Sequence, residues 1–164
     1  MPSAPPSSIT RPWIWFTLAA VVVVLDQITK QVASSELSYA MPEPVFFWLN
    51  MTLHHNQGAA FSFLSDAGGW QRWFFTALAA VVSLVLVIWL RRLGPHQRVL
   101  ALGLSLVLGG AVGNLLDRLR LGYVVDFISV HYQTWYFPTF NIADAAISVG
   151  AVFLIIDSFF PASD

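Results

Sequence analysis

Four segments of this chain are apolar enough and long enough to cross a membrane. A spanning helix needs about 20 residues, and the segments cover residues 12–33, 70–90, 98–117 and 142–160. Hydrophobic residues make up 57% of the chain and charged residues only 10%, whereas a soluble domain carries about 25% charged residues. The sequence therefore predicts a mainly α, polytopic membrane protein whose residues 1–164 form a single membrane-embedded domain.

The first apolar segment has a second interpretation. One arginine precedes it, and the small residues Ala33–Ser35 could form the cleavage site of a secretory signal peptide. We favour a retained helix because Asp26 and Lys30 would separate the apolar core from that cleavage site. The Pro- and Ser-rich residues 1–10 are predicted to be a disordered tail.

Charge and composition exclude several functional classes. The net charge of −1 offers no electrostatic case for binding nucleic acid. The chain has no cysteine, which excludes disulfides, thiolate metal sites and a cysteine nucleophile. Neither an H-E-x-x-H nor a G-x-S-x-G motif is present. We expect no metal and no cofactor.

Two stretches between the apolar segments are predicted to lie outside the membrane. Residues 45–55 (VFFWLNMTLHH) are rich in aromatic and β-favouring residues, which predicts one or two short strands. We expect this small β element to lie on the bilayer with Phe46, Phe47 and Trp48 at headgroup level. Residues 121–140 are amphipathic and aromatic, and too polar to span.

Four spans put both termini on one side of the membrane, together with the turn at residues 91–98. Basic residues number four on each side, so their count does not decide the orientation. Three arginines lie within the eight residues of the turn. That density favours a cytoplasmic location for the turn and the termini.

Two aspartates near the end of the chain are the strongest candidates for chemistry. Asp126 and Asp144 each lie among apolar residues and are predicted at the same membrane face. Ionisable groups in such surroundings are functional candidates. Two nearby carboxylates tend to share one proton, so the ionised member can activate water while the protonated member polarises a carbonyl. The pattern indicates hydrolysis by an aspartate pair, without assigning the proton to either residue.

Each aspartate also has a purely structural interpretation. Asn141 could be the N-cap of the last helix, with Asp144 three residues later in a capping arrangement. Asp126 could pair with Arg118 or Arg120. These alternatives stay open at the level of single residues.

Further polar residues lie at helical spacing in the first and third apolar segments. Asp26 and Lys30 are four residues apart and share a face, so they form either an interfacial ion pair, with Lys30 extending to the headgroups, or a support for the site. Gly110, Asn114 and Asp117 form one stripe, in which Asn114 could hydrogen-bond across the helix bundle.

Other mechanisms and classes remain as alternatives. A Ser–Lys dyad would use Lys30 with Ser34 or Ser35. A small proton-coupled transporter would use the intramembrane aspartates as relay groups, but these cluster at one end and no inverted repeat is visible. A non-catalytic lipid-binding or assembly protein is the third class.

Five sequence blocks, in order, resemble the bacterial lipoprotein signal peptidases (type II signal peptidases). The resemblance covers roughly residues 13–160. The blocks are D-Q-x-T-K at Asp26–Lys30, N-Q-G-A-A-F-S at Asn56–Ser62, G-G-A-V-G-N-L-L-D-R at Gly109–Arg118, V-V-D-F at Val124–Phe127 and F-N-I-A-D at Phe140–Asp144.

The resemblance implies an aspartic endopeptidase of the bacterial inner membrane. Its substrate would be a prolipoprotein carrying diacylglycerol, cut on the N-terminal side of the lipidated cysteine near the periplasmic face. The family's catalytic aspartates correspond to Asp126 and Asp144. Its substrate-binding or site-supporting positions correspond to Asp26, Lys30, Asn56, Gly58, Ala59, Asn114, Asp117, Arg118 and Asn141. We expect membrane lipid around a monomer.

Overall fold

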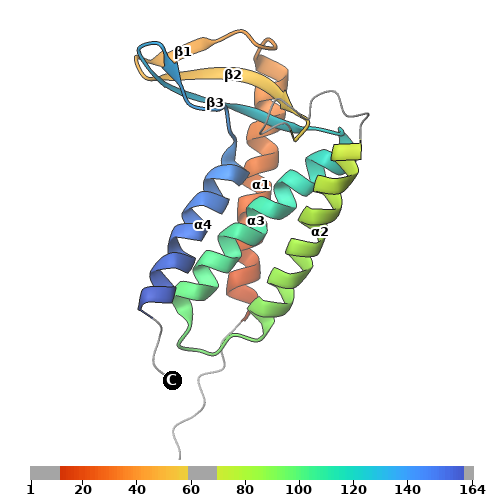
Figure 1. The fold of residues 1–164 in the computed structure, drawn as a ribbon, viewed down its shortest axis with the longest axis vertical. Coiled ribbons are helices and arrows are strands. Elements are labelled where there is room, and N and C mark those ends of the chain that lie inside the picture. Colours follow the sequence, from red (N-terminus) through yellow and green to blue (C-terminus); the bar gives the residue numbers. More distant parts are fainter. Residues whose placement is uncertain (1–11, 59–69, 161–164) are drawn as a thin grey trace, which may run out of the picture.

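The protein is a bundle of four helices with a small sheet at one end (Figure 1). The computed structural model describes residues 12–58 and 70–160, so the predicted tail at 1–10 lies outside the described residues. The elements are α1 (Pro12–Glu36), β1 (Glu43–Phe46), β2 (Leu49–Asn56), α2 (Trp70–Arg91), α3 (Arg98–Arg120), β3 (Val124–Tyr132), β4 (Trp135–Tyr136) and α4 (Ile142–Phe159).

The predicted membrane-protein fold is confirmed. Four helices in the described residues are long and apolar enough to cross a membrane. Three of them extend beyond the predicted spans, because α1 continues to Glu36, α2 to Arg91 and α3 to Arg120. Hydropathy marks the point at which the apolar residues end. The backbone hydrogen bonds of a helix continue past that point into polar residues.

Helix α3 is the centre of the bundle and packs against α1, α2 and α4. Its buried residues Leu100, Leu104 and Leu108 form a core with Leu86 and Leu90 of α2. The outer faces of the other helices expose large apolar side chains, as expected of surfaces that contact lipid.

Small residues bring α3 and α4 close together. A Cβ atom added at Gly110 would collide with the backbone carbonyl oxygen of Ala143, and one added at Gly103 would lie 3.0 Å from the carbonyl oxygen of Gly150. Backbone atoms cannot move aside as a flexible side chain can. Gly103 and Gly110 of α3 therefore form a packing surface that sets the distance between α3 and α4.

Replacing Gly110 with alanine should destabilise the protein by about 1–3 kcal/mol, because a methyl group would be forced against the backbone of α4. Thermal unfolding in detergent would measure the loss. Gly94→Ala is the matched control, since a Cβ there has no neighbour nearer than 3.7 Å. Equal stability of the two variants would contradict the packing role of Gly110.

The sheet has the strand order β1-β2-β3-β4, and all neighbouring strands are antiparallel. The prediction of strands in residues 45–55 is confirmed by β1 and β2. Residues 121–140 were expected only to be amphipathic, yet they contain β3 and β4. The residues from Val124 to Phe127 are all buried. Alternation of apolar and polar residues is the usual sign of an antiparallel strand. β3 lacks this alternation at the end where both of its faces are buried.

Candidate active site

The fold brings Asp126 and Asp144 to neighbouring segments. Asp126 lies on β3 and Asp144 in the first turn of α4. The backbone around Phe140 pairs with β3, where the N–H groups of Phe127 and Ile128 donate to the Phe140 carbonyl at 3.0 and 2.9 Å. Helix α4 therefore starts directly beside the strand that carries Asp126.

Asn141 contacts both halves of the aspartate pair. It is the N-cap of α4, and its Oδ1 accepts a hydrogen bond from the backbone N–H of Asp144 at 2.9 Å. Its Nδ2 donates to Asp126 Oδ1 at 2.7 Å. The predicted capping interaction is confirmed, and the residue that provides it also binds the other carboxylate. Structural and functional interpretations of Asn141 are therefore compatible.

The Asp126 carboxylate is held by asparagine side chains. Asn56 Nδ2 donates to its Oδ2 at 3.0 Å, and the Gly58 backbone N–H donates to Asn56 Oδ1 at 2.9 Å. Gly58 has φ +98°, and an added Cβ would lie 2.5 Å from the Phe75 ring, so only glycine fits. Among the described residues Asp126 forms no ion pair, and the predicted pairing with Arg118 or Arg120 is wrong.

Burial is the main electrostatic influence on Asp126, whose side chain is almost completely enclosed. Burial raises the pKa of Asp126 to about 6, and the negative charge of Asp144 acts in the same direction. The hydrogen bonds from Asn56 and Asn141 and the charge of Lys30 act to lower this pKa. A carboxyl group so placed can exchange a proton near neutral pH.

The Asp144 carboxylate is half-buried and is held from α3. Asn114 Nδ2 donates to Asp144 Oδ1 at 2.8 Å. Asn114 Oδ1 accepts from Lys30 Nζ at 2.9 Å and from Asn141 Nδ2 at 3.3 Å. The predicted hydrogen bond of Asn114 across the bundle is confirmed, and its partner is an aspartate of the pair.

Lys30 forms a buried ion cluster beneath the pair. Its Nζ lies 2.8 Å from Asp26 Oδ2, 2.9 Å from Asp117 Oδ2 and 2.9 Å from Asn114 Oδ1. These three partners use all the hydrogens of the ammonium group, so a Ser–Lys dyad with Lys30 as the base is wrong. The side chain of Lys30 is only 3% exposed, so its extension to the lipid headgroups is also wrong.

The carboxylates of the ion cluster each hold a backbone segment next to the aspartate pair. Asp26 Oδ1 accepts from the backbone N–H of Ala143 at 2.9 Å, at the start of α4. Asp117 Oδ2 accepts from the backbone N–H of Val125 at 3.1 Å, at the start of β3. The cluster thus ties α1 and α3 to both segments that carry the pair.

The structure unites most of the predicted site residues in one hydrogen-bonded network. Arg118 joins it less directly, because its Nη1 donates to the Asn114 backbone carbonyl at 3.4 Å and its guanidinium lies 5.7 Å from the Phe75 ring centre. Ala59 lies outside the described residues. The transporter relay is not supported, because its proposed carboxylates, Asp26, Asp117, Asp126 and Asp144, are joined by the hydrogen bonds of one network instead of being spaced along the bundle.

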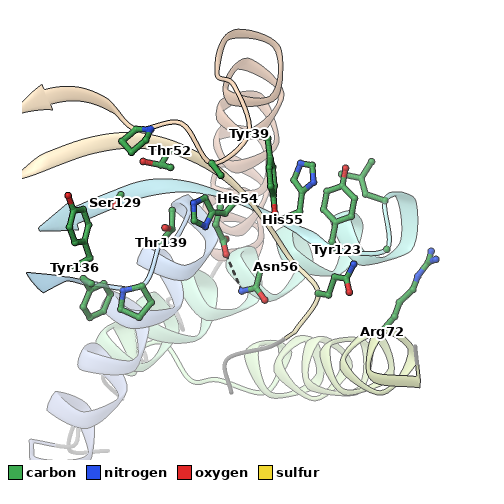
Figure 2. A pocket seen from close by; sticks show the side chains of 18 of the residues that line it. Tyr39, Thr52, His54, His55, Asn56, Arg72, Tyr123, Ser129, Tyr136 and Thr139 are labelled. Atoms are coloured by element: carbon green, nitrogen blue, oxygen red, sulfur yellow. Dashed lines mark hydrogen bonds between the residues drawn. The ribbon is translucent and has the colours of Figure 1, made fainter. Parts of the chain in front are cut away.

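A cleft of about 1150 Å³ opens between the sheet and the bundle, and Asp126 and Asn56 line it (Figure 2). Asp144 is not part of its wall. Several lining residues were not predicted from the sequence, among them Tyr39, Thr52, His54, Arg72, Ser129 and Tyr136. The two-residue period of a strand could have found some of them, because Thr52 and His54 precede Asn56 by four and two residues on β2.

His54 has the closest relation to the pair among these missed residues. It is the partner of Asp126 in the β2–β3 ladder, so both side chains lie on the same face of the sheet. His54 is exposed within the cleft. Beside it, the rings of His55 and Tyr123 stack with centres 4.1 Å apart. The cleft wall therefore joins aromatic and polar groups around Asp126.

Comparison with known proteins identifies the family. The family described as signal peptidase (SPase) II matches residues 18–160. A lipoprotein signal peptidase of Acinetobacter baumannii is 59% identical over 147 residues, which cover 90% of this chain and 84% of the relative. One of Teredinibacter turnerae is 56% identical over 146 residues, covering 89% and 87% of the two chains.

Solved structures agree with this assignment. Two structures of a bacterial membrane enzyme, obtained by the in meso method, match with TM-scores of 0.78 and 0.79. Their sequences are 30% and 28% identical to this one. The first match covers 92% of this chain and 94% of the other, and the second covers 99% and 98%. This chain, a multi-pass membrane peptidase, therefore belongs to the signal peptidase II family.

Proposed function

We propose that this protein removes the signal peptide from diacylglyceryl-modified prolipoproteins, with Asp126 and Asp144 as its catalytic pair. It cuts the peptide bond on the N-terminal side of the lipidated cysteine. The observation that carries the proposal is Asn141, a single side chain that contacts Asp126 and the backbone of Asp144. The names of the relatives, lipoprotein signal peptidases, support the substrate class.

The chemistry follows from one proton held by two carboxylates. The ionised carboxylate takes a proton from a water molecule as that water attacks the scissile carbonyl carbon. The protonated carboxylate donates to the carbonyl oxygen, which gives a neutral tetrahedral intermediate. In the breakdown of the intermediate the C–N bond is cleaved, and the carboxyl group that took the proton from water gives it to the leaving amine. The other carboxylate takes a proton back from a hydroxyl of the intermediate, which restores the starting pair. Confinement of a lipid-anchored substrate at the bilayer adds proximity.

Purified protein in detergent should cleave a diacylglyceryl-modified prolipoprotein, and mass spectrometry would locate the cut. We expect a product that begins at the lipidated cysteine. The same precursor without its lipid serves as the control and should be a poor substrate. Cleavage at another bond, or none by the folded protein, would overturn the proposed function.

The pH dependence should report the aspartate pair. Activity requires one proton on the pair, and the pKa of Asp126 is raised to about 6. kcat/KM should therefore fall as the pH rises through about 6, where the pair loses that proton. Replacing Asn56 with leucine removes a hydrogen bond that lowers the Asp126 pKa. The fall in kcat/KM should then move to higher pH.

The control for this pH profile concerns His54, because histidines also titrate near this range and His54 faces Asp126. In His54→Gln the fall in kcat/KM should stay at the same pH. Its disappearance would assign the titration to His54. An unshifted profile in Asn56→Leu would remove Asn56 from the electrostatics of the pair.

The orientation proposed here places both termini in the cytoplasm and the active site near the periplasmic face of the inner membrane. Three arginines of the turn between α2 and α3, namely Arg91, Arg92 and Arg98, support a cytoplasmic turn. The sheet lies at the opposite end of the bundle (Figure 1). Membrane lipid surrounds the helices. We propose a monomer, because a single chain supplies the three asparagines that bind the aspartate pair.

Single cysteines would test this orientation, because the chain contains none. A membrane-impermeant maleimide applied to spheroplasts should label Thr134→Cys, in the exposed turn between β3 and β4. His96→Cys, exposed in the turn between α2 and α3, should react only after the membrane is ruptured. The reverse pattern would invert the proposed topology. Light scattering of the protein in detergent would test the monomer.

A further inference from the structure

We propose that the single proton of the pair lies on Asp144 Oδ2, and that Lys30 is a positioning residue that, acting through Asn114, keeps this proton off Asp144 Oδ1. Asp126 is then the ionised member that activates water. This inference deepens the proposed function and rests on it. The direction of each hydrogen bond decides where the proton lies, because an asparagine amide has one end that donates and one end that only accepts.

The asparagines around Asp126 cannot rotate their amides end for end. Asn56 Oδ1 faces the backbone N–H of Gly58, and Asn141 Oδ1 faces the backbone N–H of Asp144. Either rotation would place an amide N–H against a group that can only donate. The donating Nδ2 atoms must therefore point to Asp126, one to each oxygen, at 3.0 and 2.7 Å.

Lys30 fixes the amide of Asn114 in the same way. A lysine ammonium has three donors and no acceptor, so the amide end that faces Lys30 Nζ at 2.9 Å must be the oxygen. The donating end of Asn114 then points to Asp144 Oδ1 at 2.8 Å. Lys30 thereby controls a carboxylate with which it has no direct hydrogen bond.

These directions leave one oxygen of the pair for the proton. Both oxygens of Asp126 and Oδ1 of Asp144 face donors. In residues 12–58 and 70–160, no protein donor contacts Asp144 Oδ2. A hydroxyl oxygen accepts a hydrogen bond more weakly than a carboxylate oxygen. Protonation also removes the negative charge that strengthens the hydrogen bond at the other oxygen. A proton on Asp126 would thus weaken two amide hydrogen bonds, whereas a proton on Asp144 Oδ2 weakens only the one from Asn114 to Oδ1.

Burial acts in the opposite sense, because it favours a neutral Asp126. The raised pKa nevertheless gives the pH at which the coupled pair loses its proton. Which of the two carboxylates carries the proton below that pH is a separate property. Other ionisable groups lie around the pair and along the cleft. They are Asp26 and Lys30 on α1, His54 and His55 on β2, Arg72 on α2, Asp117 and Arg118 on α3, and the cleft tyrosines Tyr39, Tyr123 and Tyr136.

Carboxyl ¹³C NMR can locate the proton without measuring cleavage. The full-length protein in detergent would carry ¹³C at the aspartate side-chain carboxyls, and the loss of signals in Asp126→Asn and Asp144→Asn would assign the two peaks. At about pH 5, where the pair holds one proton, we expect the Asp144 signal at the position of an acid and the Asp126 signal at that of a carboxylate. The opposite assignment would overturn the inference, even for an active enzyme.

Variants then test how the proton is directed. In Lys30→Met, Asn114 Oδ1 keeps only the longer hydrogen bond from Asn141 Nδ2 at 3.3 Å, so the amide can turn its oxygen toward Asp144 Oδ1. That oxygen of Asp144 can then also hold the proton, and the preference of the proton for Asp144 should rise by about tenfold or more. If that variant does not fold, Asn56→Leu replaces it, because loss of a donor to Asp126 should move proton density from Asp144 to Asp126. An unchanged distribution in the folded variant would show that the amides do not direct the proton. Failure of cleavage alone would affect only the proposed function.

Discussion

Asp126→Asn and Asp144→Asn are each expected to lower kcat/KM for a lipidated precursor by a factor of about 10³ or more. Asparagine retains the size of aspartate but cannot exchange the proton on which the chemistry depends. The residues act as a unit, so the double variant should be scarcely less active than either single one. Cleavage of purified, folded variants would be followed by the appearance of the released signal peptide.

Asp157→Asn is the matched control for these substitutions. Asp157 lies on α4 like Asp144, but near the other end of the helix and outside the hydrogen-bonded network. Its replacement should leave kcat/KM unchanged. Full activity of a folded Asp126→Asn or Asp144→Asn variant would remove that aspartate from the chemistry. A non-catalytic assembly role would tolerate both isosteric changes, so activity loss also separates that class from the peptidase.

Lys30→Met is expected to cause the largest loss of stability, about 3–5 kcal/mol. The methionine fills a similar volume, but Asp26 and Asp117 lose the cation that compensates their buried charges. Both carboxylates are almost completely enclosed, with exposed fractions of 0% and 3%. Thermal unfolding in detergent would measure the change, and a loss of this size corresponds to a decrease in Tm on the order of 10 °C.

Two further variants make this stability prediction specific. Arg92→Met removes an exposed cation from the turn between α2 and α3 and should change stability by no more than about 0.5 kcal/mol. Adding Asp117→Asn to Lys30→Met removes one of the uncompensated charges and should restore part of the loss. Wild-type stability of Lys30→Met would show that the buried ions do not support the fold.

Much of the architecture is a local property and could be predicted from the sequence. The four helices were evident because a span needs an uninterrupted apolar length, and β1 and β2 because residues 45–55 favour extended backbone. The five sequence blocks indicated the family and the two aspartates. The N-cap at Asn141 was also visible, since capping joins residues only three positions apart.

The three-dimensional arrangement explains what the sequence left open. Asp26 binds the backbone of Ala143 across 117 positions, and Lys30 binds Asn114 across 84. No periodicity in a single helix encodes such contacts, because they depend on how α1, α3 and α4 pack. The sequence therefore allowed Lys30 to extend toward lipid and Asp126 to pair with an arginine. Packing buried Lys30 between two carboxylates and gave Asp126 amide partners, because buried charges require compensation and buried acceptors require donors.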